Sequence, residues 1–404
     1  MTIKFSLRTA LSACALCATG LLIVTSPAAA TGRAGTDPGA PGRPKTAMPQ
    51  PALLEREGTQ VRLRSGAPET PEVSALSWLV ADAASGEVLA AYDAHEKLPP
   101  ASTLKTLFAL TVLPAFPGGL RHTVSGAELA GIGEGSSLVG VVEGHTYQVS
   151  DLWRGVFLNS GNDAVHVLAA LNGGWDRTAR QMQDKARSLG AVDTHVVSPD
   201  GYDADGQVSS AYDLAVFGRA GLRNPDFARY CSTVNALFPG NDGGSFGIAN
   251  TNRLLTGADG VEPYPGLIGI KNGYTTNAGN TLVAAAHRDG RTLIVTVMNP
   301  QEGDGLEVYE EARQLLDWGF DAAGHVDPVG SLDALRPVAH AAAAPAPAPS
   351  PSPSHAPVAA ARAEAASAWP DWPETGAVVG GVVGVGAGAV LLVRRRRNPR
   401  FGRG

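Results

Sequence analysis

The stretch "TLVAAAHRDGRTLIVTVMN", residues 281–299, has the pattern of a β-hairpin. Two apolar runs, Leu282–His287 and Thr292–Val297, flank Asp289-Gly290, and Asp-Gly between such runs is a strong signal for a tight hairpin turn. The stretch "ALSWLVADAASGEVLAAYDA", residues 75–94, predicts a second hairpin near the start of the apolar part of the chain. A hairpin is therefore expected at each end of this part.

The residues between the hairpins, 101–235, have mainly the apolar spacing of helices. After the second hairpin, "GLEVYEEARQLLDWGF", residues 305–320, predicts an amphipathic helix. This order indicates a mixed α/β fold, more specifically of the α+β type. An antiparallel sheet is built from both ends of the domain, and a helical subdomain is inserted between them. Residues 75–330 form the expected domain, which is long enough for a substantial core.

The segments before this domain have a different character. Residues 1–30 place two basic residues before an apolar run that ends in three alanines, the layout of a cleaved signal peptide. Residues 31–74 are rich in Gly, Pro and Arg without an apolar period, which predicts a disordered leader. The protein is therefore expected to cross the plasma membrane.

The segments after the domain predict an anchor. Residues 331–375 are rich in Ala, Pro and Ser, as in an extended stalk, and 376–393 are eighteen residues without a charge. Such a segment predicts a transmembrane helix, and the basic tail 394–404 is expected to stay in the cytoplasm, which leaves the domain on the outer face. The sequence "WPETG", residues 372–376, resembles a sortase signal, so attachment to the cell wall remains an alternative.

Charge and cysteine content exclude several functional classes. The formal net charge is −6, although the last eleven residues contain six arginines and no acids, so the domain is acidic and no nucleic-acid partner is expected. Cys231 is the one cysteine outside the predicted signal peptide and is interpreted as a buried small hydrophobe. The nine histidines show no paired ligand spacing, so neither a metal nor another cofactor is predicted.

One motif combines a serine and a lysine. In "LPPASTLKTLFALTVLP", residues 98–114, two prolines precede a helix predicted from Ser102 to Leu113. Ser102 and Lys105 are three residues apart and share a helix face. A serine at a helix start lies near unpaired N–H donors, and a lysine with a depressed pKa can accept its proton. The same pattern also fits an N-cap serine beside a solvated lysine.

Two further motifs contain polar residues at turns. "SGND", Ser160–Asp163, separates two apolar stretches of helical period, which predicts a turn between two helices. In "GLIGIKNGYTTNAGNTLV", residues 266–283, an apolar run ends in Lys271. A lysine at a strand end supplies a fixed positive charge for a ligand carboxylate, and Gly273 lets the ligand backbone approach closely. Each motif alone also fits an ordinary turn.

The three motifs in this order are characteristic of penicillin-recognising serine acyl-transferases. With "PASTLK", "NSGNDA", "SPDGYDADGQVSSAYDLAVFGR", "NTNRLL" and "GIKNGYTTNAGNTLVAAAHRDG", the chain resembles the D-alanyl-D-alanine carboxypeptidase family, the low-molecular-mass penicillin-binding proteins. The resemblance covers about 75–320. It implies a β-lactamase/transpeptidase-like fold, peptidoglycan stem peptides as substrate and β-lactams as inhibitors.

The resemblance also implies roles for the residues of the motifs. Ser102 would attack the carbonyl between two terminal D-alanines, with Lys105 as general base. Ser160 would relay protons toward the leaving amine, and Asn162 would orient Lys105 and the substrate amide.

The third motif would bind the end of the substrate. Lys271, followed by Asn272 and Gly273, would hold the terminal carboxylate. The backbone amides of Ser102 and Tyr274 would form the oxyanion hole.

Some residues depart from the family pattern. Leu104 stands where threonine is usual before the catalytic lysine, and Asn272 replaces the threonine of Lys-Thr-Gly. An asparagine carbonyl turned inward would repel a carboxylate, so Asn272→Thr is expected to raise kcat/KM. The β-rich C-terminal domain usual in the family is replaced by the stalk and the predicted membrane segment.

Two other functions remain open at this point. A class A-like β-lactamase needs an extra carboxylate for deacylation, and the one considered between Asn162 and Lys271 is Glu262, in a predicted loop. A catalytically inactive cell-wall binding module is the second alternative.

Overall fold

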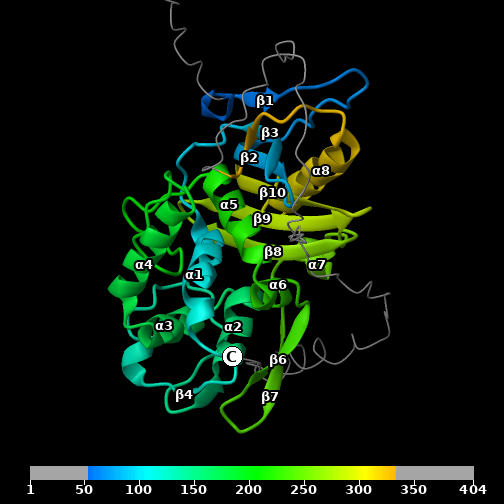
Figure 1. The fold of residues 1–404 in the computed structure, drawn as a ribbon. Helices are drawn as coiled ribbons and strands as arrows, with labels where there is room; N and C mark the ends of the chain where they lie inside the picture. Colours follow the sequence, from blue (N-terminus) through cyan, green and yellow to red (C-terminus); the bar gives the residue numbers. More distant parts are fainter. Residues whose placement is uncertain (1–52, 334–404) are drawn as a thin grey trace, which may run out of the picture. The chain divides into compact units, whose positions relative to one another are not determined.

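The computed structural model describes residues 53–333 (Figure 1). Within this range, seven strands form one antiparallel sheet in the order β1-β3-β2-β10-β9-β8, and β11 also pairs with β3. The strands are β1 (Thr59–Val61), β2 (Ala75–Asp82), β3 (Glu87–Tyr92), β8 (Leu267–Thr275), β9 (Gly279–Arg288), β10 (Arg291–Pro300) and β11 (Gly330–Ser331).

Both predicted hairpins are confirmed. Strands β2 and β3 form the first, and β9 and β10 the second, with Arg288 opposite Arg291 around Asp289-Gly290. The hairpins meet at the centre of the sheet, where Val295 of β10 is paired with Val80 of β2. The two ends of the domain therefore build one sheet, as the sequence predicts.

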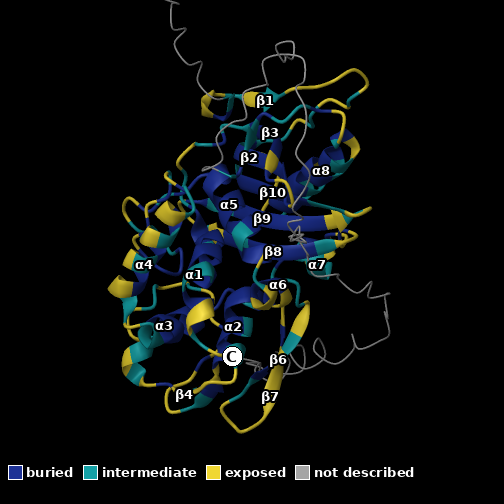
Figure 2. Ribbon diagram, in the orientation of Figure 1, coloured by how far each residue is buried: buried dark blue, intermediate teal, exposed yellow. Residues whose placement is uncertain are grey.

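The sheet separates two apolar cores because successive side chains of a strand point to opposite faces. On β10, Ile294 belongs to the core shared with α5 (Ala211–Leu222), and Val295 to the core under α8 (Glu307–Ala322). Each helix buries an apolar face against one side of the sheet, so the strands are buried on both faces (Figure 2).

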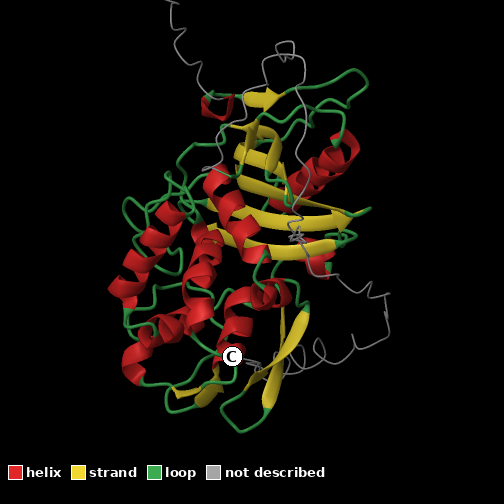
Figure 3. Ribbon diagram, in the orientation of Figure 1, coloured by secondary structure: helices red, strands yellow, loops and turns green. Residues whose placement is uncertain are grey.

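The helices and small sheets of the inserted subdomain lie between β3 and β8 in sequence (Figure 3). In addition to α5, the helices of this insertion are α1 (Lys105–Val112), α2 (Val149–Leu158), α3 (Asn162–Leu171), α4 (Trp175–Ser188), α6 (Pro225–Cys231) and α7 (Arg253–Thr256). Two small hairpins complete it: β4 (Arg121–Thr123) with β5 (Thr146–Gln148), and β6 (Asn235–Pro239) with β7 (Ser245–Ala249).

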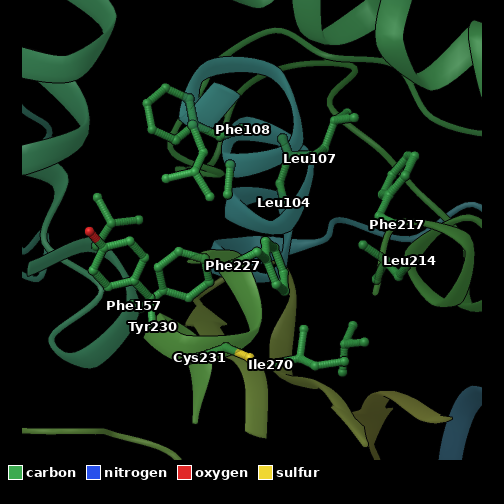
Figure 4. Close-up of a cluster of buried hydrophobic side chains, with 14 of the residues drawn as sticks. Leu104, Leu107, Phe108, Phe157, Leu214, Phe217, Phe227, Tyr230, Cys231 and Ile270 are labelled. Carbon is green, nitrogen blue, oxygen red and sulfur yellow. The ribbon is translucent and has the colours of Figure 1, made fainter. Parts of the chain in front are cut away.

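The apolar core beneath α1 holds that helix in place. Figure 4 shows Leu104 and Phe108 pointing into a cluster that α2, α5, α6 and β8 complete. Cys231 is fully buried in this cluster, and burial raises the pKa of its thiol, which agrees with the expected packing role. Because α1 is packed along its length, the residues at its start have a rigid support.

The start of the domain differs from the prediction. The leader was expected to be disordered up to residue 74, but Thr59–Val61 form β1 and pair with β3, and Leu54 is buried. The indole N–H of Trp318 also donates to Pro68 O, 3.1 Å away. A three-residue strand has too short a pattern to be recognised in sequence, and its pairing depends on a distant partner.

The end of the ordered domain also differs slightly from the predicted boundary at residue 330. Ser331 pairs with Glu87, and Asp333 forms a 2.6 Å salt bridge with the buried Arg219. These contacts extend the folded part to the last described residue.

The predicted signal peptide, most of the leader, most of the stalk, the predicted membrane segment 376–393 and the basic tail lie outside the described residues. Between Leu53 and Asp333, no helix combines the length and apolar character that a membrane span requires.

Candidate active site

Ser102 lies in a tight turn immediately before α1. Residues Ala101–Leu104 form a 3₁₀ turn rather than the first turn of the predicted α-helix. A 3₁₀ turn has three residues per turn, so residues i and i+3 are stacked, and Lys105 comes directly above Ser102. Ala101 has a positive φ of 49°, a strained conformation for a residue with a side chain.

The ammonium of Lys105 joins the first two motifs. Its Nζ atom donates to Ser102 Oγ at 2.7 Å, to Asn162 Oδ1 at 2.7 Å and to Ser160 Oγ at 3.3 Å. An ammonium has three N–H donors, and each of them has one of these three acceptors. The side chain is only 1% exposed, which fixes the direction of each bond.

Burial changes the proton affinity of Lys105. Removal from water lowers its pKa to about 8, and the negative charges of Asp200 and Asp163 offset part of this effect. A lysine with this pKa is partly neutral near physiological pH and can accept a proton.

The SGND segment forms the predicted turn between α2 and α3. Ser160 has a φ of 57° and Asn162 is the first residue of α3. The carboxylate of Asp163 accepts four backbone N–H bonds, from Val139, Gly140, Val141 and Ala164. This buried carboxylate ties the loop before α2 to the start of α3, which holds the turn beside Lys105.

Ser136 completes the orientation of Asn162. The Asn162 Nδ2 atom donates to Ser136 Oγ at 2.9 Å, so its Oδ1 atom faces Lys105. The sequence did not point to Ser136, because a serine in a Gly-rich loop has no distinctive spacing.

The third motif lies on β8, the edge strand of the sheet beside the Ser102 turn. Lys271 is 2% exposed and its Nζ atom donates to the Asn272 carbonyl at 2.8 Å. Burial and the charge of Lys105 hold its pKa well below the usual value. Both effects oppose a positive charge on Lys271, and the negative charge of a bound anion would offset them.

Asn272 is held by residues outside the motif. Its Oδ1 atom accepts a hydrogen bond from Thr251 Oγ1 at 3.0 Å. Tyr309 of α8 lies on the same side; burial raises the pKa of its phenol, and interactions with Arg253 and Asn272 offset part of this rise. The asparagine carbonyl is therefore already paired with a donor within the protein.

Gly273 is required by a contact within the protein. A β-carbon on this residue would lie 2.6 Å from the backbone nitrogen of Ser102 and 2.8 Å from Thr281 Oγ1. The approach of a ligand was the expected reason for this glycine, but the nearest atom is the backbone nitrogen of the Ser102 turn.

A cavity of about 660 Å³ opens at the end of β8. Tyr274, which is 67% exposed, lies at this cavity with Asn272 and Gly273. A groove at a strand edge beside a nucleophile can accommodate an extended peptide.

The family model for D-alanyl-D-alanine carboxypeptidases matches residues 64–302, more than half of the chain. The chain belongs to this family. It is a serine-type carboxypeptidase with the penicillin-binding fold.

Individual relatives agree with this assignment. D-alanyl-D-alanine carboxypeptidase DacB2 of Mycobacterium tuberculosis is 41% identical over 271 residues, 66% of this chain and 89% of the relative. DacD of Escherichia coli K12 is 35% identical, over 62% of this chain and 64% of its own length.

Solved structures of relatives have the same fold. The crystal structure of D-alanyl-D-alanine carboxypeptidase from M. tuberculosis H37Rv has a TM-score of 0.61 at 38% identity. The match covers 67% of this chain and 99% of the crystallised chain. The Streptomyces K15 DD-transpeptidase has a TM-score of 0.57 at 25% identity, and the match covers 63% of this chain and 99% of the transpeptidase.

Two further titratable residues of this carboxypeptidase lie outside the three motifs. His166 of α3 packs against Trp175 in a tilted arrangement, with ring centroids 4.2 Å apart, and burial lowers the pKa of His166. Glu262 is exposed, and its backbone carbonyl accepts from Arg313. The carboxylate that acts most strongly on Lys105 is Asp200, which the sequence analysis did not consider.

Proposed function

We propose that this carboxypeptidase removes the terminal D-alanine from peptidoglycan stem peptides through an acyl-enzyme on Ser102. The observation that carries the proposal is the set of three bonds from buried Lys105 to Ser102, Ser160 and Asn162. This arrangement joins a nucleophile to a base and the base to groups that orient it.

The acylation step follows from this geometry. Neutral Lys105 takes the hydroxyl proton as Ser102 Oγ attacks the carbonyl carbon between the two D-alanines. The oxyanion formed accepts hydrogen bonds from the backbone N–H groups of Ser102 and Tyr274. As the C–N bond breaks, the leaving amine takes a proton from Lys105 through Ser160.

Hydrolysis then restores the enzyme. Lys105 takes a proton from water, the resulting hydroxide attacks the ester carbonyl, and the proton returns to Ser102 Oγ as the ester bond breaks. A β-lactam acylates Ser102 in the same way, but its leaving nitrogen stays attached to the acyl group. The proposed acyl-enzyme of a penicillin is therefore longer-lived than that of a peptide.

The substrate carboxylate is proposed to bind at the end of β8. Lys271 would supply the positive charge that pairs with this carboxylate, whose own charge favours the ammonium form. Burial makes a charge-assisted bond at this site stronger than in water.

The membrane location is a proposal based on sequence alone. Residues 376–393 would anchor the protein and Arg394–Arg397 would remain on the cytoplasmic side, which leaves the active site facing the cell wall.

A labelled penicillin and a diacyl-Lys-D-Ala-D-Ala peptide test the proposal on the purified protein. Stable labelling together with release of D-alanine supports the carboxypeptidase, and Ser102→Ala should abolish both while the thermal unfolding temperature is unchanged. Rapid penicillin turnover without D-alanine would indicate the β-lactamase, and neither signal would indicate a binding module. Labelling at the wild-type level in Ser102→Ala would show that another serine is the nucleophile.

A further inference from the structure

One loop of the helical subdomain lies directly against the catalytic turn. Gly201, in "SPDGYD" (residues 198–203), has a φ of 81°, and a β-carbon there would lie 2.0 Å from the carbonyl oxygen of Ala101. Ala101 immediately precedes Ser102, so the backbone of this loop is packed against the residue that sets the position of the nucleophile.

The same loop contacts segments on two other sides. The Tyr202 hydroxyl donates to Glu134 O at 2.8 Å, and its ring lies against Gly133. Asp203 Oδ2 accepts from the backbone N–H of Asn277, 3.2 Å away, in the turn between β8 and β9. The loop is therefore fixed between the segment that contains Ser136 and the strand that contains Lys271.

Asp200 is held inside this loop with a free acceptor. Its side chain is 2% exposed, and Oδ1 accepts from the Tyr202 backbone N–H at 3.0 Å. Among the described residues, no hydrogen-bond donor is paired with its Oδ2 atom. A buried carboxylate with so few donors retains most of its electrostatic effect on neighbouring charges.

Four charged or titratable groups act on Lys105 or are affected by it. Asp200 and Asp163 attract the ammonium, with Asp200 having the larger effect, whereas Lys271 and His166 both respond to its charge. The four backbone N–H groups bonded to Asp163 already compensate that carboxylate. Asp200 is therefore the main counter-charge for Lys105.

We propose that Asp200 is a positioning residue of the acyl-transfer reaction, whose fixed carboxylate stabilises the ammonium that forms when Lys105 takes the proton of Ser102. The inference rests on the proposed function of Ser102 and Lys105. The proton moves from Ser102 Oγ to Lys105 Nζ, and Asp200 takes no part in this transfer. Because burial opposes a charge on Lys105, the counter-charge is needed during the reaction.

The substitution Asp200→Asn removes the charge of this side chain and retains its shape. In Asp200→Asn an amide oxygen can still accept from the Tyr202 N–H. The second-order rate constant for acylation by a fluorescent penicillin is measured on the full chain from pH 5.5 to 10. Without the attractive charge, Lys105 loses its proton more easily. The acid limb of the pH–rate profile, where the rate rises with pH, should therefore move to lower pH by roughly one unit. The plateau should fall several-fold because a weaker base accepts the proton less well.

Asp203→Asn is the matched control. It removes the same charge from the same loop, but Asp203 is not among the groups that act on Lys105. Its acid limb should coincide with that of the wild type. If Asp200→Asn does not fold, Asp200→Ser removes the charge with a smaller polar side chain and is measured in the same way.

An acid limb that stays at the wild-type pH in the folded Asp200 variant overturns the inference, even if the rate falls at every pH, because a purely structural role lowers the rate uniformly. This result is distinct from failure of the proposed function. That failure would appear in the wild type, as absence of labelling or of D-alanine release.

Discussion

A β-carbon on Gly273 would lie 2.6 Å from the backbone nitrogen of Ser102, although the two residues belong to different elements. Strand β8 is therefore pressed against the 3₁₀ turn that presents the nucleophile. The contact is between backbones, so neither side can relieve a clash by changing a rotamer. Gly273 sets the distance between the strand that receives the substrate and the serine that attacks it.

Gly273→Ala should reduce the rate of penicillin acylation by roughly two orders of magnitude, the scale for displacing a catalytic group by about 1 Å. The added methyl group must push β8 away from Ser102. Stopped-flow labelling measures the rate, and thermal unfolding reports on the fold. Gly247→Ala on β7 is the control, because nothing lies within 4 Å of its added β-carbon. Acylation by Gly273→Ala at the wild-type rate would contradict the steric role.

The rate of acylation should depend on pH through Lys105. Its pKa of about 8 means that the neutral base is scarce below this pH, so the rate should rise as pH increases through 8 and then level off. Lys105→Ala should be slower by about 10² or more at the plateau, the usual scale for loss of a positioned base. The exposed Lys97→Ala serves as the control. A rate that is flat between pH 6 and 9 in the wild type would argue against Lys105 as the base.

The bond between Thr251 and Asn272 changes the expectation for the third motif. Thr251→Val keeps the shape and removes the donor, which frees the Asn272 carbonyl to face the substrate carboxylate. We expect kcat/KM for a D-Ala-D-Ala peptide to fall about threefold to tenfold, the effect of losing one hydrogen bond. Penicillin acylation should fall in parallel, because both ligands present a carboxylate.

In the wild-type background, Asn272→Thr should leave kcat/KM unchanged or lower it, contrary to the sequence-based expectation of a gain. The asparagine carbonyl already has a donor in Thr251, so the substitution removes no repulsion. A clear increase in kcat/KM would show that the carbonyl faces the ligand in the complex.

Deletion of residues 372–404 should release the protein from the membrane fraction and leave its activity intact. The apolar cores described above are built from residues within 53–333, which lie before the deleted segment. Fractionation followed by penicillin labelling tests both parts. If the full-length protein is instead covalently bound to cell-wall fragments after cleavage between Thr375 and Gly376, the sortase alternative is correct.

The hairpins and the spacing of the motifs could be predicted because the signals are local. Asp289-Gly290 specifies a tight turn through its own backbone preferences, and the apolar runs beside it give the strands. Ser102 and Lys105 are close because they are three residues apart in a turn, whatever surrounds them. Each motif is ambiguous alone, but the three motifs in this order are characteristic of the family.

Contacts between distant segments could not be predicted in this way. β1 is a strand only because β3 provides a partner, and Ser136 orients Asn162 only because Asp163 fastens the intervening loop. Neither residue pattern differs from that of an ordinary loop.

The sequence by itself determined the fold class, the family and the identity of the candidate nucleophile, base and carboxylate-binding lysine, because periodicity and motif spacing are properties of the chain. The tertiary structure decided the electrostatic state of the site. Burial lowers the pKa of both Lys105 and Lys271, and Asp200 acts on Lys105 from a separate loop. Desolvation and Coulomb interactions depend on distances in space, which only the folded chain defines.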